Sequence, residues 1–218
     1  MKRITALAAA LLLAAVPAFS QIIPGAGYLN STLTSNTNGN VSSVVQDGFY
    51  AGASVNLDLG GIKGLSFVPG AYVSFITSTG TRGADLIVIS GTSTSTFTEI
   101  ALNAPARLKY GLSIGSGAQI YAFAGPVFQF GILSQTNTNT KSTNIISGEH
   151  NTTNVSNWYT EGRGYNRFNI YIGGGVGVEY GRFGANIGYD YGLMNVYRGY
   201  DKVSGNRANL VVGVSYAL

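Results

Sequence analysis

The chain has 218 residues, with 31 glycines, 14 tyrosines, 10 phenylalanines and no cysteine. Its 13 basic and 9 acidic residues give a formal net charge of +4, and this small excess is not the charge pattern of a nucleic-acid-binding protein. Without cysteine the chain has no disulfide framework, and its length predicts a single domain.

The N-terminal segment has the pattern of a secretory signal. Two basic residues precede a short apolar run over residues 4–16, and small residues occupy the two positions that a signal peptidase reads in 18–20. The run is too short for a membrane-spanning helix, so residues 1–20 are predicted to be a signal peptide that is cleaved before Gln21. The mature domain is then 21–218. No later apolar run is long enough for a spanning helix, so a membrane-spanning chain must cross as a barrel.

An alternation of apolar and polar residues recurs about eight times along the mature chain. In residues 48–59, GFYAGASVNLDL, every second side chain is apolar and the intervening ones are polar or small. Side chains on a strand alternate between two faces, so one face meets lipid and the other lines a closed lumen. The pattern predicts an all-β fold, an eight-stranded antiparallel up-and-down transmembrane β-barrel. Its strands are expected within residues 24–34, 48–59, 65–77, 96–113, 118–133, 167–180, 183–196 and 207–218.

The connections between these segments alternate in length. Short turns are expected near residues 60–64, 114–117 and 181–182, and long polar loops at 35–47, 79–95, 134–166 and 197–206. In bacterial barrels the long loops are extracellular and the short turns periplasmic, so both termini are expected in the periplasm. The predicted lipid-facing side chains include Phe49, Val55, Leu57, Phe67, Phe75, Leu108, Phe128, Ile170, Val178 and Ile187.

Several charged residues fall on the predicted lumen face. Four of them lie near the turn ends of their strands, and two lie elsewhere on the same face: Asp58, Arg107, Lys109 and Glu179, with Glu99 and Asp190. A charge inside a narrow barrel is costly unless it is paired or hydrated. We therefore expect Asp58 and Glu179 to pair with Arg107 or Lys109 as a structural plug. A gate for small ions is the alternative, and acid–base catalysis is the least favoured interpretation.

The sequence gives little support for an enzyme. A barrel hydrolase needs a histidine held beside a serine or carboxylate, and the only histidine is His150, in the middle of the longest predicted loop. Glu149 and Ser147 lie nearby, but nothing on a polar loop fixes their geometry. We expect no catalytic residues, no metal site and no cofactor.

Two stretches of sequence resemble known barrel proteins. Gly213, Tyr216 and Leu218 are similar to the C-terminal assembly signal of outer-membrane barrels. The body resembles the small outer-membrane barrel family of Bacteroidetes that is called PorT-like or porin-family, over nearly the whole mature chain. The matching segments are GFYAG at 48–52, NAPARLKY at 103–110, YAFAGP at 121–126 and GYDYGL at 188–193. The family usually has glutamate where Asn103 stands. The resemblance implies an eight-stranded barrel in an outer membrane and no specific activity.

The expected function is that of an integral outer-membrane protein with a structural or surface-interaction role. The interior of an eight-stranded barrel is just wide enough for its own side chains, so the lumen is expected to be largely closed. The alternative is a narrow channel for small solutes or ions. The expected partners are outer-membrane lipid, lipopolysaccharide and, through the C-terminal strand, the barrel-assembly machinery. No nucleic acid is expected, and the protein is expected to be a monomer.

Overall fold

The computed structural model describes residues 21–85, 89–144, 148–160, 162 and 164–218. The predicted signal segment, residues 1–20, lies outside these residues. No helix in the described ranges is long and apolar enough to cross a membrane.

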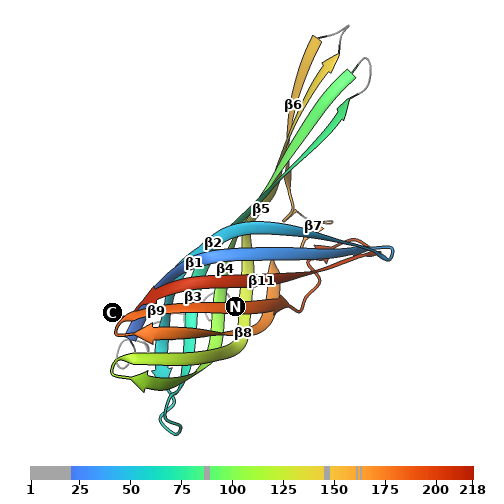
Figure 1. Cartoon of the computed structure of the whole chain (residues 1–218). Coiled ribbons are helices and arrows are strands. Elements are labelled where there is room, and N and C mark those ends of the chain that lie inside the picture. The colour runs from blue at the N-terminus through green and yellow to red at the C-terminus, as the bar shows by residue number, and fades with distance from the viewer. Residues whose placement is uncertain (1–20, 86–88, 145–147, 161, 163) are drawn as a thin grey trace, which may run out of the picture.

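Eight antiparallel strands form one closed ring, which confirms the predicted fold class (Figure 1). In ring order each strand pairs with the next, and the pairing of β1 with β11 closes the sheet, from Gly25 opposite Ser215 to Thr37 opposite Val203. The ring strands are β1 (Gln21–Thr37), β2 (Asn40–Asp58), β3 (Leu65–Asp85), β4 (Ile89–Gly115), β5 (Ala118–Asn144), β8 (Phe168–Tyr180), β9 (Phe183–Gly192) and β11 (Val203–Tyr216).

Within the described ranges, three further strands lie outside the ring. β6 (Gly148–Asn157) pairs with the distal part of β5. β7 (Gly164–Tyr165) and β10 (Tyr197–Arg198) form a separate two-stranded sheet.

The prediction of long polar loops is wrong for three of the four connections, because most of their residues continue the strands. β1 and β2 remain paired up to Thr37 and Asn40, and the turn between them is Asn38-Gly39, with φ angles of 52° and 89°. Positive φ at both turn residues matches the right-handed twist of the strands, which is why an Asn-Gly pair closes this hairpin. In the same way β3 and β4 stay paired out to Asp85 and Ser90.

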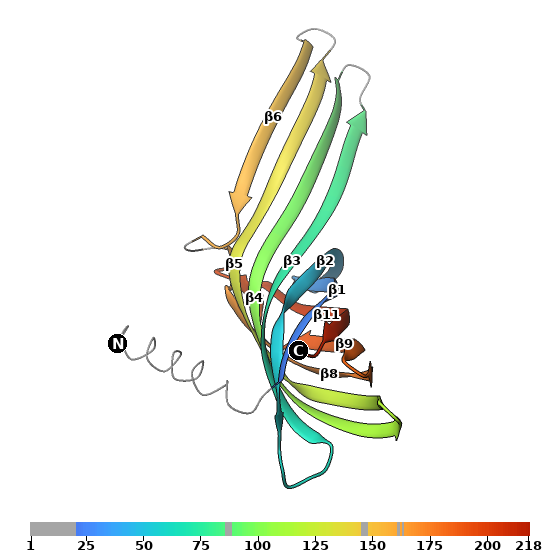
Figure 2. The ribbon, with the colours of Figure 1, turned by 90° about the vertical axis from the view of Figure 1, so that its left-hand side faces the viewer.

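The extended parts of β3, β4 and β5, together with β6, form a four-stranded sheet that rises away from the barrel (Figures 1 and 2). We call it the protruding sheet; it comprises residues 78–85, 89–98, 135–144 and 148–157. Serine, threonine and asparagine dominate its sequence. A sheet without an apolar face has no alternation of apolar and polar residues. The pattern that predicted the barrel strands therefore could not predict the strands of the protruding sheet.

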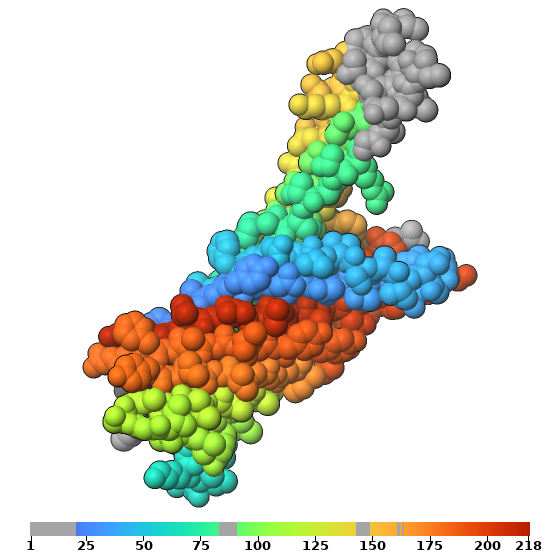
Figure 3. Space-filling view, in the orientation of Figure 1, coloured from blue at the N-terminus to red at the C-terminus, as the bar shows by residue number. Residues whose placement is uncertain are grey.

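The outer face of the barrel is an apolar belt. Among the predicted lipid-facing side chains, five are large exposed hydrophobics: Phe49, Leu108, Phe128, Val178 and Ile187. The other five are half-exposed on the same face. The space-filling view shows β9, β11 and β1 side by side in the barrel wall (Figure 3). A closed sheet pairs its strands without an open edge, so backbone groups are satisfied in lipid, and the apolar outer face completes a transmembrane β-barrel.

Candidate functional site

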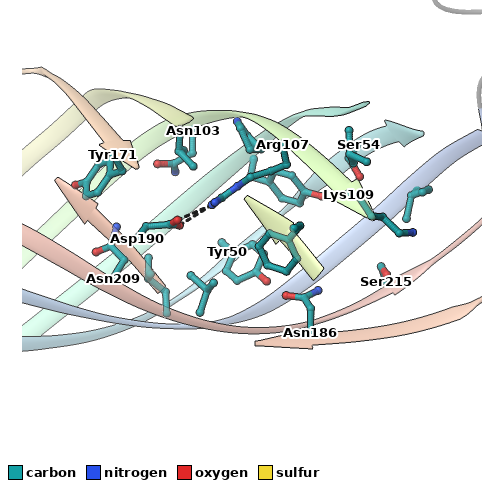
Figure 4. Close-up of a pocket in the computed structure, with 18 of the residues that line it drawn as sticks. Tyr50, Ser54, Asn103, Arg107, Lys109, Tyr171, Asn186, Asp190, Asn209 and Ser215 are labelled. Carbon is teal, nitrogen blue, oxygen red and sulfur yellow. Dashed lines mark hydrogen bonds and ion pairs between the residues drawn. The ribbon is translucent and has the colours of Figure 1, made fainter. Parts of the chain in front are cut away.

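The middle of the lumen is crossed by an ion pair between β4 and β9. Arg107 Nη2 donates to both carboxylate oxygens of Asp190, at 2.6 and 2.8 Å, and Nη1 donates to the carbonyl oxygen of Gly125 at 3.3 Å (Figure 4). The guanidinium also lies over the ring of Phe123, 5.3 Å from its centroid. The two side chains are only 10% and 9% exposed, so their charges compensate each other away from bulk water.

A second pair joins β4 to β8 closer to the short turns. Lys109 Nζ donates to Glu179 Oε1 at 2.5 Å and lies 4.5 Å from the ring centroid of Tyr121. The lysine side chain is 10% exposed and the glutamate 28%. Glu179 is therefore the lumen carboxylate with the most access to water among the three ion pairs.

The third pair lies deeper and was only half predicted. Glu99 on β4 accepts a hydrogen bond from Arg207 Nη1 on β11, and both side chains are at most 3% exposed. Within the described residues, Arg207 Nε and Nη2 have no hydrogen-bond partner. Arg207 was missed, although its signal was present: it begins an alternation in which Asn209 and every second residue after it face the lumen.

The predicted role of Asp58 in these pairs is wrong. Asp58 is the last residue of β2, it is exposed, and it takes part in none of the ion pairs among the described residues. It lies opposite Ser66, at the rim where β2 ends. Similar distance from the turns along the sequence does not bring side chains together across a lumen; Asp190, on the strand that faces Arg107, takes the place that was expected for Asp58.

Glycines opposite aromatic rings let the large lumen side chains fit. A Cβ at Gly213 would contact the Tyr50 hydroxyl, and a Cβ at Gly177 would contact the Tyr121 ring. Tyr50 in turn packs edge-on against Tyr72, with centroids 5.7 Å apart. These glycines therefore leave the space that the tyrosine side chains occupy in the narrow lumen.

This packing gives a testable prediction. Gly213→Ala should destabilise the barrel by about 1–3 kcal/mol, because the new methyl group overpacks against the Tyr50 hydroxyl. Tyr50→Phe removes that hydroxyl and should recover most of the loss in the double variant, as measured by denaturant unfolding in lipid vesicles. Gly80→Ala is the matched control, because a Cβ there has nothing within 4 Å and the change should be nearly neutral. A failure of Tyr50→Phe to rescue would contradict the fit.

The end of the lumen away from the short turns is covered by an aromatic lid, which sequence reasoning missed. Trp158 stacks on Tyr165 with centroids 4.8 Å apart, and Tyr165 contacts Phe97 at 6.2 Å. These rings join a buried cluster that also contains Leu29, Leu33, Ile76, Tyr159 and Val196. Both Trp158 and Tyr165 come from the 134–166 segment, which was predicted to be a polar loop.

Hydroxyl ladders run across the protruding sheet. On one face Thr79 contacts Thr96 at 3.3 Å between hydroxyl oxygens, and on the other Ser95 contacts Thr138 at 3.0 Å. His150 lies exposed on β6, opposite Ser142. Among the described residues there is no group of three or more histidine, cysteine, aspartate or glutamate side chains that could hold a metal ion. Ser147, which was considered with His150, lies outside the described residues.

The remaining predicted residues are those of the C-terminal signal. Gly213 is buried on the lumen face of β11, and Tyr216 ends that strand. Tyr216 packs against Phe183 with ring centroids 5.1 Å apart, at the rim where the short turns lie. Leu218 follows the strand and is exposed. The structure gives their positions, and their role in assembly stays a prediction.

No protein-family model and no curated protein matches the sequence. Solved barrels are similar in part. Neisserial surface protein A has 13% identity and a TM-score of 0.38, covering 92% of this chain and 99% of that chain. Ail, the attachment invasion locus protein of Yersinia pestis, has 13% identity and a TM-score of 0.34, covering 91% and 99%. The outer membrane protease OmpT of Escherichia coli has 8% identity and a TM-score of 0.31, covering 93% and 98%. At such scores the likeness carries no argument about function, so the barrel assignment rests on the strand ladder described above.

Proposed function

We propose that the protein is an integral barrel of the bacterial outer membrane whose protruding sheet binds a partner outside the cell by strand pairing. The open edges of the sheet carry this proposal. Among the described strands β6 pairs with β5 alone, and β3 has β2 as its neighbour only as far as Thr77. Residues 78–85 and Gly148–Asn157 therefore present backbone donors and acceptors along one edge each.

The β6 edge lacks several of the features that usually block such pairing. β6 reads GEHNTTNVSN, with no proline and no lysine, and its ten residues run without a register shift against β5. Natural sheets commonly protect exposed edges with prolines, lysines or bulges. An extended segment of a partner is the chemistry that fits such an edge, because main-chain hydrogen bonds provide the affinity.

The rest of the proposal concerns the barrel as an anchor. Three lumen ion pairs and the aromatic lid support a closed interior, which favours the anchor over the alternative of a narrow channel. Steady conductance in a planar bilayer, well above background, would support that alternative. The proposed role is not catalytic. Assignment to the PorT-like barrels belongs to this proposal and is supported by the four segments that carry the resemblance. The other expected partners also belong to this proposal: outer-membrane lipid and lipopolysaccharide at the apolar belt, and the barrel-assembly machinery. The protein is proposed to be a monomer.

The proposed orientation predicts a labelling pattern. Single cysteines at positions 150 and 63 report opposite ends of the molecule, because His150 lies on β6 and Lys63 in the short connection before β3. The chain has no native cysteine to interfere. In intact cells an impermeant thiol reagent should label position 150 and not position 63, and permeabilised cells should show both. Labelling at 63 alone in intact cells would place the protruding sheet in the periplasm.

The strand-pairing proposal is tested by photo-crosslinking in the native host. A photoreactive residue at Thr153, on β6, should give adducts with a polypeptide partner, and the same residue at Lys63 should not. A matched variant lacks residues 138–154 and joins Asn137 to Val155 through an Asn-Gly turn, since these two are paired across β5 and β6. Cells carrying it should lose the partner while the barrel remains in the membrane. The absence of any polypeptide adduct at Thr153 would contradict the strand-pairing proposal and would favour a purely structural role for the barrel.

A further inference from the structure

The lumen contains a cavity that the proposed surface role does not use. Its volume is about 200 Å³. It extends from Ile23, Glu179 and Ser215 near the turn end, past the Arg107–Asp190 pair, to Tyr171 (Figure 4). An apolar cavity of about 150 Å³ inside a protein is large enough to bind benzene. The space is therefore sufficient for one small ring compound.

Access to this cavity falls from one end of the barrel to the other. Glu179 is 28% exposed near the turns, Arg107 and Asp190 are about 10% exposed in the middle, and Glu99 and Arg207 are at most 3% exposed beyond them. Tyr171 and the lid cluster lie at the closed end. The lumen is thus a blind pocket with its entrance at the turn end.

The walls of the pocket are mostly carbon. Tyr50, Tyr72, Tyr121 and Phe123 bring aromatic rings to it from three strands, and branched aliphatic side chains such as Val68 also line it. Gly175 on β8 and Gly188 on β9 leave room for the Phe123 ring, because a Cβ at either position would contact it. Such walls favour an apolar, flat molecule.

The entrance adds the Lys109–Glu179 ion pair. Lys109 Nζ has three N–H donors, and among the described residues its side-chain hydrogen bond is the one to Glu179. It lies on the cavity wall beside Tyr121, with Asn186 and Ser215 also lining the pocket. A carboxylate that enters from the turn end can accept from the free ammonium donors while its apolar part lies against the rings.

We propose that the lumen is a binding site, open at the turn end, for a small carboxylate with an apolar ring. The ring lies among Tyr50, Tyr72 and Phe123, and the carboxylate accepts hydrogen bonds from Lys109. A free inorganic anion does not use the aromatic walls, and a neutral hydrocarbon does not use the ammonium. The site therefore binds a molecule that has both an apolar ring and a carboxylate.

The probe for this proposal is 4-fluorobenzoate, observed by ¹⁹F NMR with the full barrel in lipid nanodiscs. We expect saturable binding that unlabelled benzoate displaces and that empty nanodiscs do not show. The neutral analogue 4-fluorobenzyl alcohol, which keeps the ring and lacks the carboxylate, should bind at least about tenfold more weakly, the ratio that about 1.4 kcal/mol of a charge-assisted hydrogen bond produces. Equal affinity for the two probes would show that Lys109 does not bind the carboxylate and would contradict the proposal.

Two variants separate the ring pocket from the charge. Ser54→Phe fills the cavity, since Ser54 lines it, and should abolish binding of both probes. The double variant Lys109→Gln/Glu179→Gln keeps the lumen neutral and should reduce the binding of 4-fluorobenzoate to that of the alcohol. Retention of native affinity in both variants would overturn the proposal.

A measurement on the unmodified protein keeps the test decisive if a variant does not fold. Photolysis with 4-azidobenzoate should give adducts that map to lumen residues of β2, β3 and β5, such as Tyr50, Tyr72 and Tyr121. Excess benzoate should suppress these adducts. Adducts confined to the outer belt, or adducts that benzoate does not suppress, would show partition into lipid and refute the site.

Discussion

Val176→Arg should destabilise the barrel by about 2–4 kcal/mol, the cost of an arginine on the lipid face near the bilayer midplane. Val176 lies on β8 between the aromatic residues Phe168 and Tyr180 that mark the two ends of the strand, and its side chain is 57% exposed on the outer face. In the membrane that exposed surface meets hydrocarbon, so the guanidinium must reach a headgroup or draw water inward.

The matched control is Val155→Arg in the protruding sheet. Val155 is also a valine on a strand and is 63% exposed, but β6 lies outside the barrel, where its surroundings are water. The change should fall within about 0.5 kcal/mol of neutral. The readout is equilibrium unfolding by denaturant in vesicles, followed by the fluorescence of Trp158, the only tryptophan. Equal losses at the two positions would mean that the outer face of the barrel is not in lipid.

The two valines also show what the sequence reveals of this fold. Val176 belongs to an apolar alternation that only a one-sided apolar surface requires, so the barrel strands and their faces were predictable from period and residue type. Val155 belongs to a strand that is polar on both sides. The pairing of this strand depends on the hairpin that it forms with β5 and on backbone hydrogen bonds. Neither of these requires a periodic pattern of side chains in the sequence.

Strand register is a second property that the side-chain pattern does not show. Opposite Ile100 and Ala101 the partner strand passes from Leu133 to Gly131, so Ile132 is an extra residue in β5. Beyond this irregularity the inward positions change from odd to even numbers, and Ser134 becomes fully buried. A bulge of one residue has no composition of its own, and an alternation read through it assigns the wrong faces afterwards.

For the lumen site, too, the sequence predicts the direction of each side chain but not its partner. The inward direction of Arg107, Lys109 and Asp190 follows from alternation on each strand alone. Which of them meet depends on how far each strand is shifted against its neighbours around the whole ring. Pairing across the lumen therefore had to come from the structure, and it replaced Asp58 by Asp190 as the partner of Arg107.

Breaking the deepest ion pair should have the largest effect of any single lumen substitution. Arg207→Met leaves the Glu99 carboxylate buried without its partner, and we expect a loss of about 3–5 kcal/mol. Lys109→Met is the comparison, because it leaves Glu179, which is 28% exposed and can be hydrated from the turn end. Its loss should be clearly smaller, although both changes remove one cation from one carboxylate.

The double variant Glu99→Leu/Arg207→Met decides whether the pair acts as a unit. Two apolar side chains in place of a buried ion pair are often close to neutral, and here Arg207 Nε and Nη2 also lack partners among the described residues, so the native pair is not fully compensated. We expect the double variant to be more stable than either single variant, with a coupling energy of at least about 2 kcal/mol in a double-mutant cycle. Additive losses from the two single changes would instead show that Glu99 and Arg207 contribute independently, and the deep pair would then have no part in closing the lumen.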